Sequence, residues 1–164
     1  MIYYINGWNG ENSIKAKKLT QYLGTEVKHL VFDNYNYNEI KEFIEQHTLD
    51  IDMLITSSTS SYIAQRLCCE NNIKLVSINP VIDIHKTFKK MGEKVPANIP
   101  INKTLYSISQ LILINKDDTL IDWNQTFELY KNNYHVEVFK KGGHRAENLE
   151  EMSKYIMESI NAIF

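Results

Sequence analysis

The stretch Asp52-Met-Leu-Ile-Thr-Ser-Ser-Thr-Ser-Ser61 decides how the rest of this sequence is interpreted. Its apolar residues 53–55 predict a short buried strand. Small hydroxyl residues follow directly, and they lead into the amphipathic segment Tyr62-Ile-Ala-Gln-Arg-Leu-Cys68. The stretch therefore predicts a strand, a tight corner and a helix in immediate succession.

The hydroxyl cluster Thr56-Ser-Ser-Thr-Ser60 lies at the predicted corner. A nucleophile elbow places a serine at a strained corner between a strand and a helix, in the pattern small-x-Ser-x-small. Ser58 occupies the centre of that pattern, with Thr56 and Ser60 at the two small positions, whereas a shift by one residue would centre Ser57. The same cluster is also typical of a helix N-cap, because hydroxyl oxygens accept from the first free N–H groups. The residues alone leave both interpretations open.

The length and composition are those of one soluble globular domain over residues 1–164. Apolar residues make up 43% of the chain and charged residues 23%. No apolar run has the length of a transmembrane helix, and the N-terminus lacks a signal-peptide pattern, so we expect a cytoplasmic protein with no membrane partner. The net charge of −2 and the scattered lysines argue against a nucleic acid partner.

Neither the cysteines nor the histidines have the spacing of a metal site. Cys68 and Cys69 are adjacent on a predicted helix, which suits neither a disulfide nor a metal knuckle, so we expect free thiols. Four histidines show no paired spacing: His29, His47, His85 and His135. The loop Asn6-Gly-Trp-Asn-Gly10 lacks the glycine spacing of a dinucleotide site or a P-loop, which disfavours a flavodoxin-like or Rossmann-like binding domain. We therefore expect no metal and no cofactor.

Strand-like and helix-like segments alternate along the chain. Strands are predicted over residues 1–5, 27–32, 53–55, 74–78, 109–114 and 134–139. Helices are predicted over residues 13–23, around 40–47, from 62 onward, and over 123–130 and 148–163. This alternation predicts an α/β fold, a three-layer α/β/α sandwich with a mostly parallel sheet.

Residues 81–103 interrupt the alternation. They contain Pro96 and Pro100 and only a short predicted helix around residues 85–91. We expect this segment to be a lid or a substrate-facing excursion, because long irregular connections in compact domains are often functional.

In a parallel α/β sheet the functional crevice lies beyond the carboxyl ends of the strands. The predicted strands end, in order, at Asn6-Gly7-Trp8, Asp33, Ser57-Ser58-Thr59, Asn79, Asp117-Asp118 and His144. Three of these ends supply, in chain order, a serine nucleophile, a carboxylate and a histidine base. This is the order used by α/β-hydrolases.

Five short stretches resemble, in the same order, the YqiA-like family of small bacterial esterases. They are Tyr4-Ile-Asn-Gly-Trp-Asn9, Leu54-Ile-Thr-Ser-Ser-Thr-Ser-Ser61, Ile78-Asn-Pro-Val81, Asp118-Thr-Leu-Ile-Asp-Trp123 and Gly142-Gly-His144. The chain differs from the family at Asn6, where a histidine is usual, and at Thr56 and Ser60, where the family has glycines. The resemblance spans nearly the whole chain and implies a minimal α/β-hydrolase.

The resemblance also implies the roles of the candidate site residues. Ser58 would be the nucleophile, His144 the general base and then acid, and Asp118 the carboxylate that orients the imidazole. The backbone N–H groups of Trp8 and Thr59 would form the oxyanion hole.

Asp117 is the alternative to Asp118, because either residue would follow the same strand. Four further side chains are expected to face the substrate: Asn6, Asn9, Asn79 and Arg145.

Two functions follow from these features. The first is a serine hydrolase of the esterase or thioesterase type, which would cleave a small acyl substrate through an acyl-enzyme. The second is a hydrolase-like binding module that has lost catalysis. The replaced glycines favour the second, and the complete set of Ser, Asp and His favours the first. An apolar stripe on the last predicted helix would permit a homodimer if it were exposed.

Overall fold

The computed structural model of this chain describes residues 1–8, 10, 14–32, 36–100 and 105–162. Asn9, expected to face the substrate, and Asp33, expected at a strand end, lie outside these residues. No helix in the described part of the chain is both long and apolar enough to cross a lipid bilayer.

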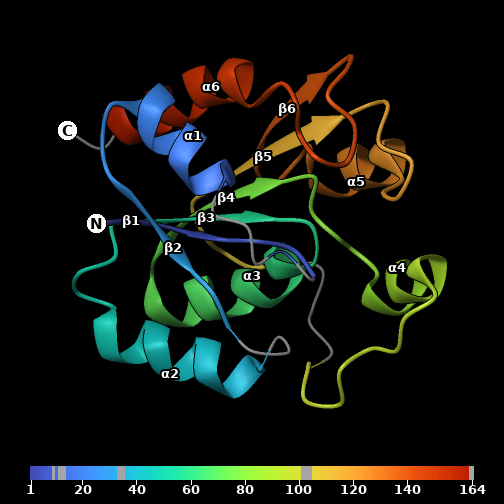
Figure 1. Ribbon diagram of the computed structural model, residues 1–164, viewed down its shortest axis with the longest axis horizontal. Coiled ribbons are helices and arrows are strands. Elements are labelled where there is room, and N and C mark those ends of the chain that lie inside the picture. Colours follow the sequence, from blue (N-terminus) through green and yellow to red (C-terminus); the bar gives the residue numbers. More distant parts are fainter. Residues whose placement is uncertain (9, 11–13, 33–35, 101–104, 163–164) are drawn as a thin grey trace.

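A parallel sheet forms the middle layer of the molecule (Figure 1). Its strands are β1 (Ile2–Ile5), β2 (Val27–Leu30), β3 (Met53–Ser57), β4 (Lys74–Ile78), β5 (Gln110–Asn115) and β6 (His135–Phe139). Their order is β2-β1-β3-β4-β5-β6, and each of these neighbouring pairs is parallel. The direction of the strand order reverses between β1 and β3, and a crevice is expected outside the carboxyl ends of strands at such a switch point.

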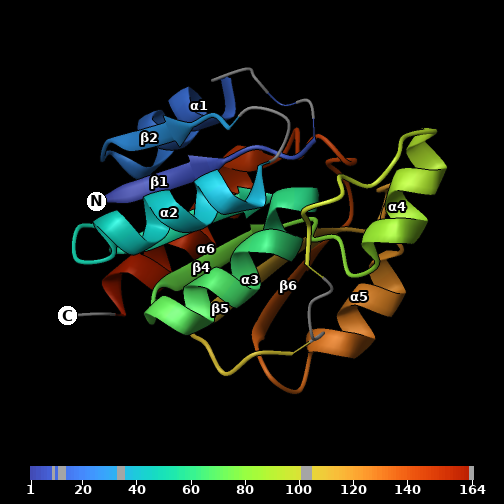
Figure 2. The same ribbon diagram turned by 90° about the horizontal axis from the view of Figure 1, so that it is seen from below.

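Helices cover both faces of the sheet (Figures 1 and 2). Those in the described residues are α1 (Ile14–Leu23), α2 (Tyr37–His47), α3 (Thr59–Asn71), α4 (Ile84–Met91), α5 (Trp123–Tyr130) and α6 (Leu149–Asn161). Helices α1 and α6 lie on one face, and α2 and α3 lie on the other. Helix α5 packs its buried Tyr130 against Ile112 and Ile114 of β5.

Alternate residues of each strand enter opposite cores because successive side chains point to opposite faces of a sheet. In β1, Tyr4 packs into the core beneath α1 and α6, whereas Tyr3 packs into the core beneath α2 and α3. In β3, Ile55 and Leu54 divide in the same way. Burial on both faces explains why these strands are continuous apolar runs in the sequence. The predicted three-layer α/β/α sandwich is confirmed, and the sheet is parallel at every described pairing.

Helix α4 lies outside the two helical layers, beyond the carboxyl ends of the strands (Figures 1 and 2). The short helix predicted around residues 85–91 is therefore present. Its apolar side, with Ile84 and Phe88, packs against Val81. The centroids of the Phe88 and Trp8 rings lie 4.9 Å apart. This places α4 next to the loop that follows β1; the role of residues 81–103 as a lid stays a prediction.

The apolar stripe of α6 faces inward. Met152 and Ile156 are fully buried in the core shared with α1 and the sheet. The stripe is therefore not the exposed surface on which we based the expectation of a homodimer, and the homodimer stays a prediction without that support.

Candidate active site

Ser58 alone connects β3 to α3. Its backbone has φ 58° and ψ −124°, a conformation that a residue other than glycine rarely adopts. Backbone hydrogen bonds hold it there: its N–H donates to Ile78 O at 3.0 Å, and its carbonyl accepts from Val81 N at 3.2 Å. Ser58 stands at the N-cap position, but its side chain makes no capping hydrogen bond. The corner therefore has the strained geometry of a nucleophile elbow, and the Ser58 hydroxyl does not serve as a helix cap.

The hydroxyl of Ser57 is used inside the protein. Its Oγ lies 2.8 Å from the Tyr4 hydroxyl, whose own proton is donated to Asn6 Oδ1 at 2.7 Å. A tyrosine hydroxyl has one proton to give, so Ser57 must be the donor to Tyr4. Burial raises the pKa of Tyr4, which keeps that hydroxyl protonated. Ser57 is therefore fixed by Tyr4, whereas Ser58 has no such partner among the described residues.

Hydroxyl side chains replace the glycines of the elbow and bond to the backbone around it. Thr56 Oγ1 donates to Val76 O at 3.1 Å on the neighbouring strand. Ser60 Oγ lies 2.9 Å from the carbonyl oxygens of Ile5 and Ser57, and it accepts from Ser57 N at 3.0 Å. Both side chains are almost fully buried. The corner is thus compatible with Thr56 and Ser60 because their polar atoms are satisfied.

Gly7 lets the loop after β1 approach the elbow closely. A Cβ atom at Gly7 would lie 2.8 Å from Ser58 Cβ and 3.1 Å from Ser57 O. Real Cβ contacts are not that short, so a larger residue here would push the loop away from Ser58.

His144 and Asp118 form a hydrogen-bonded pair. His144 follows Gly142 and Gly143, both at positive φ, in the loop between β6 and α6. Its Nδ1 lies 2.8 Å from Oδ2 of Asp118, whose side chain is fully buried. The other carboxylate oxygen, Oδ1, accepts from the N–H groups of Leu120 and Ile121 at 2.8 and 2.9 Å. These bonds fix the carboxylate so that it faces the imidazole.

Asp117 is bonded to the loop backbone instead of to His144. Its two carboxylate oxygens accept from the N–H groups of Gly143 and Gly142 at 2.8 and 3.2 Å. The bond from Gly143 is the main reason that the pKa of the Asp117 carboxyl is lowered. Of the two candidates, Asp118 is therefore the one in contact with the histidine.

Asn79, expected to face the substrate, is buried and does not line the cavity described below. The side chain is 1% exposed, and its Oδ1 accepts from Asn115 N at 2.8 Å. Its Nδ2 donates to Gly143 O at 3.0 Å. Asn79 therefore connects the end of β4 to β5 and to the loop that carries His144.

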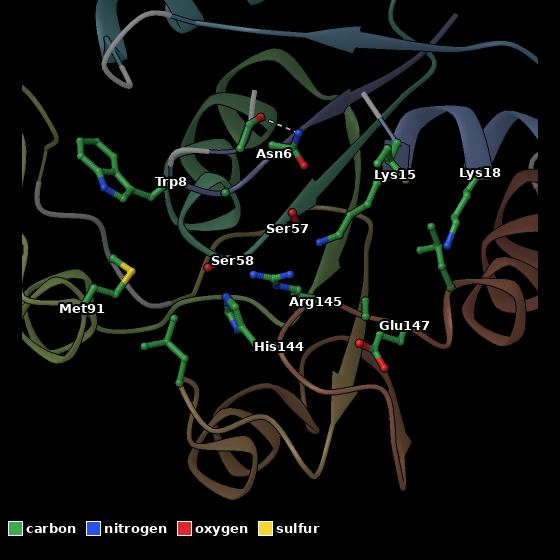
Figure 3. A pocket seen from close by; sticks show the side chains of 16 residues that line it. Asn6, Trp8, Lys15, Lys18, Ser57, Ser58, Met91, His144, Arg145 and Glu147 are labelled. Atoms are coloured by element: carbon green, nitrogen blue, oxygen red, sulfur yellow. Dashed lines mark hydrogen bonds between the residues drawn. The ribbon is translucent and has the colours of Figure 1, made fainter. Parts of the chain in front are cut away.

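A cavity of about 590 Å³ brings most of the candidate residues together (Figure 3). Ser57, Ser58, His144, Arg145 and Asn6 all line it, with Trp8 and Met91 among the other lining residues. In Figure 3 the imidazole of His144 points toward the hydroxyl of Ser58. Asn6 and Arg145 line the cavity, and their contact with a substrate stays a prediction; the Asn6 amide also donates to Gly10 O at 2.6 Å.

The two predicted oxyanion donors differ in their present partners. Thr59 is the first residue of α3, where a backbone N–H has no acceptor within the helix. The Trp8 N–H instead donates to Thr59 Oγ1 at 2.7 Å. An oxyanion bound by both groups would have to replace the Thr59 hydroxyl as the acceptor for Trp8.

Sequence reasoning missed Lys15 and Lys18, which line the same cavity from α1. The signal was their spacing, because residues three apart lie on one side of a helix. Which side that would be depends on how α1 packs, and the sequence alone does not give it. No group of three or more His, Cys, Asp or Glu side chains in the described residues is arranged to hold a metal ion.

Known structures share this architecture. A protein of the α/β-hydrolase superfamily from Xanthomonas campestris pv. campestris superposes with a TM-score of 0.74 and 14% identity, over 98% of each chain. The mouse α/β hydrolase domain-containing protein 10 gives 0.72 and 13% identity, over 99% of this chain and 90% of its own. The esterase domain of a Rhodothermus marinus protein gives 0.70 and 9% identity, over 96% and 84%.

The chain therefore has the α/β-hydrolase fold. No protein-family model and no curated protein matches the sequence. At identities this low the likeness establishes the fold, and the reaction has to be argued from the residues at the cavity.

Proposed function

We propose that this protein is a serine hydrolase of the esterase or thioesterase type that cleaves a small acyl substrate through Ser58, His144 and Asp118. The observation that carries the proposal is the 2.8 Å contact between Asp118 Oδ2 and His144 Nδ1 beside the cavity that Ser58 also lines. A buried carboxylate in that position accepts a hydrogen bond from Nδ1–H, so the imidazole Nε2 is left without a proton and can act as a base. The five stretches that resemble YqiA-like esterases give the proposal further support.

The first half of the reaction forms an acyl-enzyme. His144 Nε2 takes the proton of Ser58 as its Oγ attacks the substrate carbonyl carbon, and the carbonyl oxygen becomes an oxyanion. The Thr59 N–H would stabilise that charge, together with the Trp8 N–H once it leaves Thr59 Oγ1. The imidazolium then gives its proton to the leaving alcohol or thiol, and the bond between that group and the acyl carbon breaks.

The second half of the reaction returns the free enzyme. A water molecule gives a proton to His144 and attacks the acyl carbon, and the proton then passes to Ser58 as the carboxylic acid leaves. Asp118 stays ionised throughout and holds the ring in one orientation. No step requires a cofactor.

A fluorophosphonate probe tests this proposal directly. Such probes phosphonylate an activated serine, so native protein is expected to take up one probe per chain, on Ser58, while heat-unfolded protein takes up none. Mass spectrometry of the digested protein identifies the modified residue. Folded protein that stays unlabelled, or labelling at Ser57 alone, would contradict the proposal.

One observation favours a second candidate, a catalytically impaired binding module. The Trp8 N–H is already bonded to Thr59 Oγ1, so half of the expected oxyanion hole is occupied by the protein itself. Removing one donor of this kind typically costs about 10²- to 10³-fold in kcat. An unlabelled but folded protein would therefore make the binding module the better description.

Replacing Gly7 is expected to disturb both the fold and the reactive serine. The added methyl group of Gly7→Ala would overlap Ser58 Cβ, so we predict a loss of about 1–3 kcal/mol in the free energy of unfolding, measured with denaturant, and slower probe labelling. Gly24→Ala is the control. Gly24 has φ 65° but open space around it, so this variant is expected to lose about 1–2 kcal/mol without slower labelling. Equal labelling by both variants would contradict the close approach.

A further inference from the structure

Three basic side chains line the cavity that contains Ser58 and His144. Lys15 and Lys18 extend from α1, and Arg145 directly follows His144. Figure 3 shows the Lys15 ammonium and the Arg145 guanidinium directed into the same space, next to the two serines and the imidazole. Glu147 is the acidic side chain among the described lining residues. The cavity therefore carries an excess of positive charge.

Lys15 and Arg145 form no direct ion pair with another side chain in the described part of the chain. The ion pairs among the described residues, such as Arg66 with Glu70 at 2.7 Å, are formed by other side chains. Glu147 lies at the same cavity but within 4.0 Å of neither cation. Two like charges thus share one concave site, and no carboxylate of the described residues lies in direct contact with either of them.

Holding Lys15 in this position has an electrostatic cost. Burial and, to a smaller extent, the nearby positive charge of Arg145 lower the pKa of Lys15 to about 8, against the opposing effect of the Asp118 carboxylate. An anion placed between the two cations would remove their repulsion and replace the water that Lys15 has lost. The favourable occupant of this space is therefore negatively charged.

We propose that Lys15 and Arg145 form a subsite for an anionic group of the substrate, either a carboxylate or a phosphate. The inference rests on the proposed hydrolase function, because it concerns the same cavity and specifies which esters would bind there. An arginine can bind a carboxylate or phosphate through two parallel N–H donors, and a lysine adds a compact charge. The substrate would then be a small ester or thioester whose anionic end lies beside His144.

Hydrolysis of three matched substrates tests this subsite. They are 4-nitrophenyl acetate, 4-nitrophenyl hydrogen glutarate, and the acetyl thioester of a phosphate-bearing thiol. At least one anionic substrate is expected to exceed the neutral ester in kcat/KM by about tenfold or more. Comparing the second and third substrates distinguishes a carboxylate on the acyl group from a phosphate on the leaving group.

Substitutions assign that preference to the two cations. Lys15→Met and Arg145→Met are each expected to lower the ratio of anionic to neutral kcat/KM by about tenfold, mainly through a higher KM. Lys17→Met is the control, because Lys17 lies on the same helix, is exposed and does not line the cavity. Neutral and anionic substrates hydrolysed equally well by the unsubstituted protein would overturn the subsite and leave the proposed hydrolase intact.

Equilibrium binding separates this proposal from catalysis. Glutarate and inorganic phosphate are titrated calorimetrically into protein carrying Ser58→Ala, with and without Lys15→Met or Arg145→Met. Saturable binding is expected to weaken about tenfold in either cation variant. It is also expected to decline as the pH rises past about 8, because Lys15 then loses its proton. These results would support the subsite even if no ester is hydrolysed. Two outcomes would overturn the subsite. One is anion binding that neither substitution weakens. The other is the absence both of anion binding and of any preference for anionic substrates.

Discussion

Replacing Ser58 by alanine is expected to lower kcat/KM for a small acyl ester by about 10⁴-fold or more. The substitution removes the oxygen that would attack the carbonyl carbon, and the described residues offer no substitute at that corner. Ser57, the neighbouring hydroxyl, donates to Tyr4 at 2.8 Å and is 3% exposed. The measurement is steady-state hydrolysis of a 4-nitrophenyl ester, with freshly unfolded protein as the blank.

The fold is expected to survive this substitution. The strained backbone at Ser58 is held by two backbone hydrogen bonds that an alanine would keep: its N–H donates to Ile78 O, and its carbonyl accepts from Val81 N. Its side chain makes no capping bond, so the free energy of unfolding is expected to change by less than about 1 kcal/mol. A loss of activity can then be assigned to the missing hydroxyl rather than to unfolding.

Ser57→Ala is the matched control at the adjacent position. It removes the donor to Tyr4, so we expect a loss of about 1 kcal/mol in stability and a decrease in activity of less than about tenfold. The two serines therefore have opposite expected profiles, one in activity and the other in stability. Near-normal hydrolysis by Ser58→Ala, or loss of hydrolysis only in Ser57→Ala, would refute Ser58 as the nucleophile.

Local sequence was sufficient to predict the corner and the layers. Residues 53–55 and the hydroxyls after them specify a strand end and a turn within a few positions: β3 begins at Met53 as expected, and α3 begins at Thr59, three residues before the expected start. The predicted order of strand ends also placed Ser58 and His144 at one cavity. The hydrophobic periodicity of an element and the residues that end it are local properties of the sequence, so both can be predicted from the sequence alone.

The directions of side chains at the strand ends could not be predicted in this way. Asn79 was expected at the cavity, but its φ of 46° turns the chain, and its amide reaches Asn115 and the loop before His144. The bond from the Trp8 N–H to Thr59 Oγ1 likewise depends on how closely the loop after β1 packs on α3. Such contacts depend on three-dimensional packing. The position of a residue at the end of a predicted strand indicates only the edge of the sheet at which the residue lies, and not the partners of its side chain.

Asp118→Asn is expected to lower kcat by about 10⁴-fold while leaving substrate binding nearly unchanged. The reason lies in the fixed orientation of the side chain. Asp118 Oδ1 accepts from two backbone N–H groups, those of Leu120 and Ile121, so the oxygen of an asparagine would occupy that position. Its NH₂ group would then point at His144 Nδ1 and donate to it. The imidazole proton would move to Nε2, and Nε2 could no longer accept the proton of Ser58.

Two neighbouring carboxylates serve as controls for that prediction. Asp122→Asn keeps an efficient N-cap on α5, where Asp122 accepts from Gln125 N, so activity is expected to stay within about twofold. Asp117→Asn weakens one of the two bonds to Gly142 and Gly143, so a loss of about 1 kcal/mol in stability and less than about tenfold in activity is expected. An NMR spectrum of the His144 ring nitrogens would show which of the two, Nδ1 or Nε2, carries the proton. If Asp118→Asn left the proton on Nδ1, or if Asp117→Asn caused the larger loss of kcat, Asp118 would not be the residue that orients His144.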